Sequence, residues 1–223
     1  MCGRINQDER SFQSDQRWHN KIQKQERQFN IGIGMKALVY HSLDGKENYE
    51  YLKFGFNAGG RYNFNARIEG FHNKNNQLDY NGPLGLATNP IYKHLVNYNR
   101  CVIPVSSFIE GPEVEKLSKP FDIRFAEVKV IGLGGLIGLD EKTGELGFSI
   151  ITTWPNETIK NIVGHHRSPY IMFDPDDHGH WIDRQIPFDI ISSAVRPPHD
   201  EFLAVHPLSP AYKSPKYSEP INV

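Results

Sequence analysis

The sequence predicts a single α+β domain with a curved, barrel-like, mostly antiparallel β core and a few peripheral helices. The 223 residues include 19 glycines and 15 prolines, as expected for a chain of short strands and many turns. Apolar runs of strand length are separated by clusters of Gly, Asn, Asp and Pro. No repeat, low-complexity tract or break in composition marks a boundary, so we expect residues 1–223 to form one domain.

Six runs are predicted to be strands, and three segments to be helices. Polar residues 12–29 carry apolar side chains at roughly helical spacing, which predicts an amphipathic surface helix. Short helices are expected over Ile159–Val163 and from Pro175 toward Trp181, because a proline lies near the start of each. The Pro- and Ser-rich tail from Arg196 is expected to lie over the surface. The predicted strands are Ala37–His41, Tyr49–Phe56, Cys101–Ile109, Phe121–Phe125, Val128–Leu139 and Gly147–Thr153.

Composition limits the possible partners and compartment. The formal net charge is -1, whereas a nonspecific nucleic-acid binder usually carries a basic excess, so any DNA contact must depend on a local group of arginines. The two cysteines form no disulfide framework, and neither a signal peptide nor a long apolar run is evident. We therefore expect a cytoplasmic protein without a membrane partner.

The N-terminus offers distinctive chemistry. If Met1 is removed, Cys2 carries a free amine and a thiol on adjacent carbons. An aldehyde can form an imine with this amine, and the sulfur can then close on the imine carbon to give a thiazolidine ring. The unperturbed groups titrate near ~8 and ~8.5, so at pH 7 they need help from neighbouring acid and base groups. Taken alone, Met-Cys is more simply a start codon followed by a small residue.

Four polar segments lie beside apolar residues, and their order is informative. They are Cys2-Gly3-Arg4, Asn65-Ala66-Arg67-Ile68-Glu69, Arg100-Cys101-Val102-Ile103-Pro104 with Phe108-Ile109-Glu110, and Ile150-Ile151-Thr152-Thr153 with His165-His166-Arg167-Ser168-Pro169. Together they resemble the SOS-response-associated peptidase (SRAP) family, whose members shield abasic sites in DNA. The resemblance spans nearly the whole chain.

The resemblance implies a function in the DNA damage (SOS) response. The substrate would be single-stranded DNA that contains an abasic site, and the product a covalent thiazolidine crosslink through Cys2. Glu110 would hold the α-ammonium and take its proton, Asn65 would position the amine, and His165 would act as general acid and base. The arginines Arg4, Arg67 and Arg167 would bind flanking phosphates. No cofactor or metal is implied, and a monomer is expected.

Several tryptophans of the family pattern are replaced in this chain. Phe54-Gly55-Phe56 replaces a segment that begins with tryptophan in the family, and Gly135-Leu136-Ile137 replaces Gly-Leu-Trp. Gly111 replaces the tryptophan that follows the family's glutamate, here Glu110. Stacking of a base on an aromatic ring contributes about 1–3 kcal/mol, so these changes bear on DNA affinity more than on the covalent step.

Two other functions stay open at this point. Cys2 could serve an N-terminal-nucleophile cysteine peptidase that removes its own Met1. Alternatively, Arg4, Arg67 and Arg167 could serve a noncatalytic single-strand binder with strong salt dependence.

The candidate residues also have ordinary structural interpretations. In isolation, Glu110 fits a surface carboxylate at a strand end, and Asn65 a turn residue. His165 matches the family motif, but its neighbour His166 is a second candidate for the acid–base role. Cys101 lies in an apolar run and is expected to be a buried thiol. The acidic and histidine residues around Asp174–His180 are more typical of a helix start than of a metal site.

Overall fold

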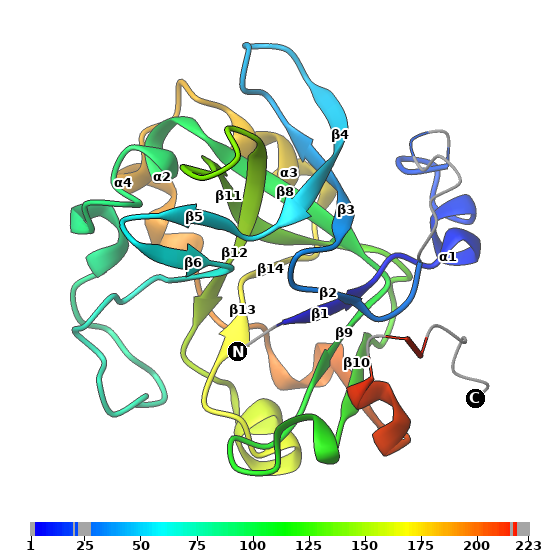
Figure 1. The fold of residues 1–223 in the computed structure, drawn as a ribbon. Coiled ribbons are helices and arrows are strands. Elements are labelled where there is room, and N and C mark those ends of the chain that lie inside the picture. The colour runs from blue at the N-terminus through cyan, green and yellow to red at the C-terminus, as the bar shows by residue number, and fades with distance from the viewer. Residues whose placement is uncertain (1–2, 20, 22–27, 215, 218–223) are drawn as a thin grey trace.

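The structure, a computed structural model, describes residues 3–19, 21, 28–214 and 216–217. Its centre is a closed barrel of five strands in the order β12-β4-β3-β8-β11, in which β11 pairs back with β12 (Figure 1). All of these pairings are antiparallel except β4 with β12. The expected α+β class with a barrel-like core is confirmed. The barrel strands are β3 (Lys36–His41), β4 (Asn48–Phe54), β8 (Arg100–Val105), β11 (Ile131–Leu139) and β12 (Leu146–Thr153).

A second sheet lies beside the barrel and contains both early and late parts of the chain. Its order is β15-β10-β9-β1-β2, and all of its pairings are antiparallel. Its strands are β1 (Arg4–Asn6), β2 (Ile31–Gly32), β9 (Ser107–Glu110), β10 (Phe121–Phe125) and β15 (Leu203–Pro207). Short strands complete the structure: β5 (Phe56–Ala58) with β6 (Arg61–Asn63), β7 (Asn65–Arg67) and β13 (Ser168–Pro169) on β12, and β14 (Ile171–Met172) on β11.

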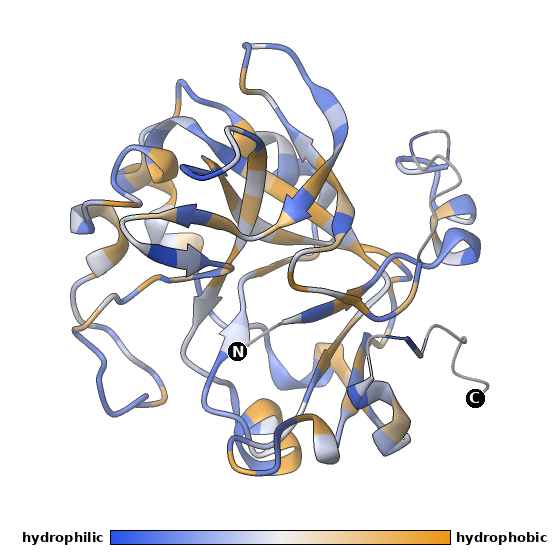
Figure 2. Ribbon diagram, viewed as in Figure 1, coloured by the Kyte–Doolittle hydropathy of each residue, from blue (hydrophilic) through white to orange (hydrophobic). Residues whose placement is uncertain are grey.

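Both faces of β3, β8, β11 and β12 are covered, which explains why these four strands read as nearly continuous apolar runs. Alternate residues belong to two separate clusters: Ala37 and Val39 pack with Ile103 and Ile150, whereas Leu38 packs in the other cluster. This period of two is the geometry of a strand. Figure 2 shows the hydrophobic residues gathered on the central strands and the hydrophilic ones in the loops.

Two predicted strands are each divided in the structure. Tyr49–Phe56 breaks at Gly55, whose φ is +98° and where a Cβ atom would lie 2.3 Å from the Tyr62 ring. Cys101–Ile109 breaks at Ser106, whose N–H donates to the Asn6 carbonyl at 2.9 Å. After this break the chain leaves the barrel and enters the second sheet as β9, so the break positions Glu110.

The predicted helix over residues 12–29 is wrong for the described residues. The helix α1 covers Glu9–Gln13 and ends at the cap residue Ser14. Residues 14–19 form turns, because the Asp15 carboxylate accepts from the Arg17 N–H at 3.1 Å and competes with helical hydrogen bonding. Phe12 and Trp18 are nevertheless both buried. The rest of the predicted helix includes residues 20 and 22–27, which lie outside the described residues.

The other helical elements are short and peripheral. Both predicted short helices are present, as the π-helical turn η3 (Ile159–Val163) and as α3 (Pro175–Ile182). Asp174 caps α3 by accepting from the Asp176 N–H, which supports the helix-start interpretation of this acidic run. In the described part of the chain, no helix has the length and apolarity needed to cross a membrane. The remaining elements are α2 (Leu95–Tyr98), α4 (Phe188–Ile191) and the 3₁₀ turns η1 (Gly85–Thr88), η2 (Lys116–Ser118), η4 (Ser192–Ala194), η5 (Asp200–Phe202) and η6 (Pro210–Lys213).

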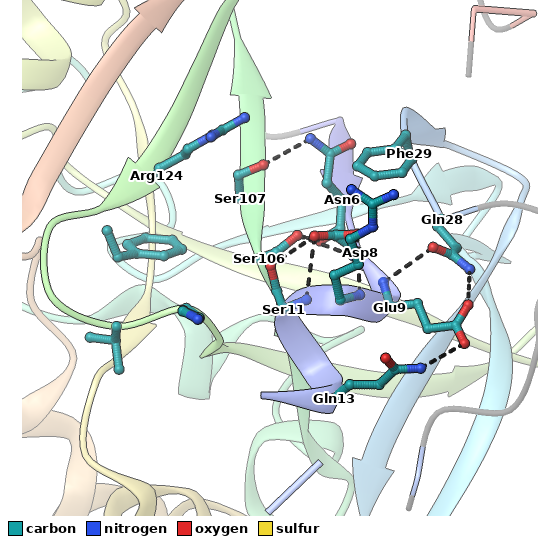
Figure 3. A pocket seen from close by; sticks show the side chains of 14 residues that line it. Asn6, Asp8, Glu9, Ser11, Gln13, Gln28, Phe29, Ser106, Ser107 and Arg124 are labelled. Carbon is teal, nitrogen blue, oxygen red and sulfur yellow. Dashed lines mark hydrogen bonds between the residues drawn. The ribbon is translucent and has the colours of Figure 1, made fainter. Parts of the chain in front are cut away.

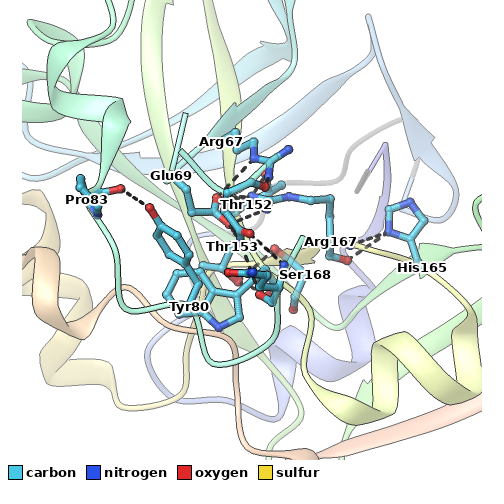
Figure 4. Close-up of polar contacts among 12 residues, drawn as sticks. Arg67, Glu69, Tyr80, Pro83, Thr152, Thr153, His165, Arg167 and Ser168 are labelled. Atoms are coloured by element: carbon cyan, nitrogen blue, oxygen red, sulfur yellow. Dashed lines mark hydrogen bonds and ion pairs between the residues drawn. The ribbon is translucent and has the colours of Figure 1, made fainter. Parts of the chain in front are cut away.

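A buried ion pair ties the end of β7 to the segment before β13. The Glu69 carboxylate is fully buried and accepts two hydrogen bonds of 2.7 Å from the Arg167 guanidinium. Arg167 also donates to the carbonyl and the hydroxyl of Thr152 on β12, at 2.7 and 3.2 Å (Figure 4). Paired hydrogen bonds of this kind are among the strongest between side chains.

The same carboxylate anchors a third segment. Asn73 is buried, and its Nδ2 lies 3.3 Å from a Glu69 oxygen. The Arg67 guanidinium lies 3.6 Å from the other Glu69 oxygen and donates to the Asn73 carbonyl. Glu69 thus joins β7, the turn at Asn73 and the loop that carries Arg167.

We expect Glu69→Gln to lower the free energy of unfolding by about 3–5 kcal/mol, because it leaves the buried Arg167 cation without its counterion. Urea denaturation at neutral pH measures this loss. The matched control is Glu113→Gln, which removes a carboxylate from an exposed pair with His166 and should change stability by less than about 1 kcal/mol. Equal stability of the two variants would contradict the assigned role of Glu69.

Candidate functional site

A cleft of about 690 Å³ opens between the second sheet and the loop after η3. Its walls include the ends of β1 and β9, the segment after β9 and the two histidines at 165 and 166. We call it the Glu110 cleft. It is lined by Gly3, Arg4, Gly32, Ile33, Met35, Phe64, Ile109, Glu110, Gly111, Pro112, Glu113, Lys116, Leu117, His165 and His166.

Glu110 reaches the cleft as the last residue of β9. It is only 8% exposed, and a carboxylate oxygen accepts from the Gly111 N–H at 3.2 Å. On the neighbouring strand, Arg4 pairs with Ile109. Gly3, which precedes Arg4, therefore lies alongside Glu110 and lines the same cleft.

His165 reaches the cleft from the opposite wall. The preceding turn η3 ends at Gly164, which has a φ of +75°, a conformation that favours glycine. The Gly164 carbonyl accepts from the Glu113 N–H at 3.1 Å and so joins the two walls. His165 Nε2 lies 3.7 Å from the Glu110 carboxylate. Its Nδ1 lies 3.1 Å from both the N–H and the carbonyl oxygen of Arg167, so one residue offers a partner to either ring tautomer.

Burial has opposite effects on the two titrating groups. Desolvation raises the pKa of Glu110 above its ordinary 4.5, because the cleft disfavours the carboxylate anion. Desolvation lowers the pKa of His165 to about 3, because it disfavours the imidazolium cation. At neutral pH the imidazole is therefore uncharged and able to accept a proton.

The structure brings Glu110 and His165 together, and Asn65 lies next to a cleft residue. Asn65 begins β7 directly after Phe64, which lines the cleft. Its Nδ2 donates to the Phe64 carbonyl at 2.9 Å, and its own carbonyl accepts from the Tyr92 hydroxyl at 3.2 Å. Cys2 lies outside the described residues, and the nearest described residue to it in sequence is Gly3.

The three candidate phosphate ligands occupy different environments. Arg4 lines the Glu110 cleft, and its guanidinium donates to the Asn30 side chain and the Lys213 carbonyl. Arg67 has a side chain that is 31% exposed. Arg167 is buried against Glu69 and Thr152, so in this structure its side chain supports the loop of His165, and a phosphate contact would require the ion pair to open.

Sequence reasoning missed several residues of the site. Lys116 adds a second cation to the cleft, and Glu113 pairs with His166 at 3.0 Å. The His166 ring stacks on that of His165, with centroids 4.8 Å apart. Glu113 and Lys116 follow Glu110 by three and six residues, but spacing alone does not separate them from other loop charges.

A cavity of about 820 Å³, larger than the cleft, lies at the other end of β1 (Figure 3). None of the predicted site residues lines it. Its polar groups bond to one another: Asn6 donates to the Ser107 hydroxyl at 2.8 Å, and Glu9 accepts from Gln13 and Gln28. We therefore place the candidate site in the smaller Glu110 cleft, where buried titratable groups face each other.

Comparison with known proteins gives relatives of low identity. An abasic site processing protein, YoqW, of Bacillus subtilis is 26% identical over 140 residues, and so is its counterpart in Bacillus phage SPbeta. The match covers 60% of this chain and 61% of each relative.

Solved structures share the fold. A phage-related protein from Bordetella bronchiseptica has a TM-score of 0.69 and 20% identity, with 93% of this chain and 94% of that chain covered. A protein from Bacteroides thetaiotaomicron has a TM-score of 0.63 and 18% identity, with 82% and 79% covered.

The family model described as SOS response associated peptidase (SRAP) matches residues 1–215, nearly the whole sequence. The resemblance noted in the sequence motifs is thereby confirmed, and the chain belongs to the SRAP family.

Proposed function

We propose that this protein binds single-stranded DNA at abasic sites and forms a covalent thiazolidine crosslink through Cys2. The observation that carries the proposal is the cleft in which the buried Glu110 and His165 face each other 3.7 Å apart, with Gly3 in its lining. Family membership and the name of the YoqW relatives support the same substrate class.

In the first step, the sugar at the abasic site opens to its aldehyde. The neutral His165 imidazole accepts the proton of the C1 hydroxyl, and a proton is returned to the ring oxygen as the C1–O bond breaks. The lowered pKa of His165 keeps the imidazole uncharged at neutral pH and makes it a weak base, so a proton that it takes is passed on readily.

In the second step, the α-amine of Cys2 attacks the aldehyde carbon. Glu110 takes the proton that the ammonium must lose, and Asn65 orients the amine. Loss of water gives the imine, the thiol sulfur adds to the imine carbon, and the thiol proton passes to the nitrogen. The net reaction joins an aldehyde and an aminothiol to give one thiazolidine and one water.

The positive side chains at the mouth complete the proposal. Arg4 and Lys116 line the cleft. Arg67, which follows Asn65 by two residues, has a partly exposed side chain. These cations favour a phosphate backbone although the whole chain carries a formal charge of -1.

We expect the protein freed of Met1 to give a heat-stable, shifted band on a denaturing gel with single-stranded DNA that contains one abasic site. Cys2→Ala should abolish the band, because alanine has no thiol to add to the imine carbon and close the ring. Intact-mass measurement establishes that Met1 is absent.

The second cysteine of the chain supplies the matched control. Cys101 is fully buried, and burial raises the pKa of its thiol, so Cys101→Ala should retain the band. A band with Cys2→Ala that is as strong as with the unmodified sequence would overturn the proposal, as would equal bands with undamaged DNA.

As the pH is lowered, the rate of crosslinking should begin to fall at a pH above 4.5, which is the ordinary pKa of a glutamate. The reason is that a raised pKa makes Glu110 protonate at a higher pH, and the protonated carboxyl cannot take the ammonium proton. Single-turnover rates between pH 4 and 8 measure this limb. Glu110→Gln should be slow and should keep only the gradual decline that protonation of the Cys2 amine causes; an unchanged limb in that variant would assign the titration to another group.

A further inference from the structure

A second cleft of about 510 Å³ adjoins the first across the pair of stacked histidines. Glu113, His165 and His166 line both clefts. The remaining lining residues are Asn75, Asn76, Gln77, Leu78, Pro155, Lys160 and Gly164. We call this the Asn76 cleft.

The lining of the Asn76 cleft suits a nucleobase. Three consecutive amide side chains, at residues 75 to 77, offer both hydrogen-bond donors and acceptors. Leu78 and Pro155 supply apolar surface, and Lys160 supplies a cation for a phosphate. The carboxylate of Glu113 is engaged with His166 at 3.0 Å.

Asn76 itself has unmet hydrogen-bonding capacity. Its Oδ1 is buried and has no hydrogen-bond partner among the described residues. A buried acceptor without a partner is unfavourable, and a ligand that donates a hydrogen bond would satisfy it once the side chain turns toward the cleft. The Asn76 backbone has a φ of +50°, a conformation that asparagine tolerates better than most residues.

The turn that presents these amides is held in place by Glu69, the carboxylate that also anchors the loop of His165 and Arg167. Asn73 Oδ1 accepts from the Gln77 N–H at 2.8 Å, and Asn73 Nδ2 bonds to the Gln77 carbonyl and to Glu69. Glu69 also holds Arg167, whose backbone orients His165. The turn on one wall of the Asn76 cleft is therefore connected through Glu69 and Arg167 to His165 in the Glu110 cleft.

We propose that the Asn76 cleft binds the base of a nucleotide next to the lesion and reads its hydrogen-bonding edge through Asn75, Asn76 and Gln77. The identity of the ligand as DNA rests on the proposed function. Asparagine and glutamine amides form paired hydrogen bonds with adenine, so adenine is the favoured neighbour.

The test uses single-stranded DNA that carries a tetrahydrofuran analogue of the abasic site, flanked by thymines except for one varied neighbour on the 5′ or the 3′ side. Fluorescence anisotropy should show that adenine at one of these two positions tightens binding by at least about fivefold over the other bases. The analogue has no aldehyde, so this reversible binding is measured independently of any crosslink.

Two variants assign the preference to the cleft. Asn76→Gly removes the amide at a positive φ without strain and should abolish the preference for adenine. Asn161→Ala, which changes an exposed asparagine outside the cleft, should retain it. Thermal melting establishes that both variants fold.

Several results would overturn the inference. They are affinities within twofold for all four bases at both positions, no binding to any of these DNAs, or a preference that persists when Asn76→Gly is combined with Gln77→Ala. Crosslinking to an abasic site with no base preference would overturn this inference alone. A base preference without crosslinking would overturn only the covalent proposal.

Discussion

The carboxylate of Glu69 is the point on which the geometry of the site depends. It is buried without exposure to solvent, and it accepts from Arg167 at 2.7 Å through both oxygens. A buried charge of this kind is tolerated only when it is paired and hydrogen-bonded. Because its partners come from three separate segments, one interaction fixes the loop of His165, the end of β7 and the turn at Asn73 together.

Glu110 and His165 are both largely excluded from water in the Glu110 cleft, and this governs their titration. The same exclusion of water raises the pKa of Glu110 and lowers that of His165, so it favours the uncharged form of both groups. Perturbed titration in a concave site is typical of functional residues. In the 820 Å³ cavity, by contrast, several polar groups bond to one another, as Asn6 does to Ser107 and Gln13 to Glu9.

Local patterns predicted the barrel strands well, because both sides of β3, β8, β11 and β12 are covered and apolar runs follow. They were incomplete where long-range contacts decide: the tail was expected to lie over the surface, and the structure adds that Leu203–Pro207 pairs with β10. The apolar spacing of Phe12 and Trp18 was taken as helical, but turns bury both side chains.

The family motifs located Glu110 and His165 in sequence, but not the environment of Arg167. Its burial depends on Glu69, which lies 98 residues earlier, and no local pattern encodes that pairing. The amide turn at 75 to 77 was also missed, because Asn and Gln in a loop are ordinary until the opposite wall is known.

The contact between Arg4 and the Lys213 carbonyl, at 2.9 Å, spans 209 positions of the chain. During synthesis on the ribosome, this contact cannot form until nearly the whole polypeptide has emerged. Closure of the barrel is delayed in the same way, since β4 pairs with β12 only after about a hundred further residues. While most of the chain is being made, Arg4 therefore has only its early partners, such as Gly32 in the β1–β2 pairing.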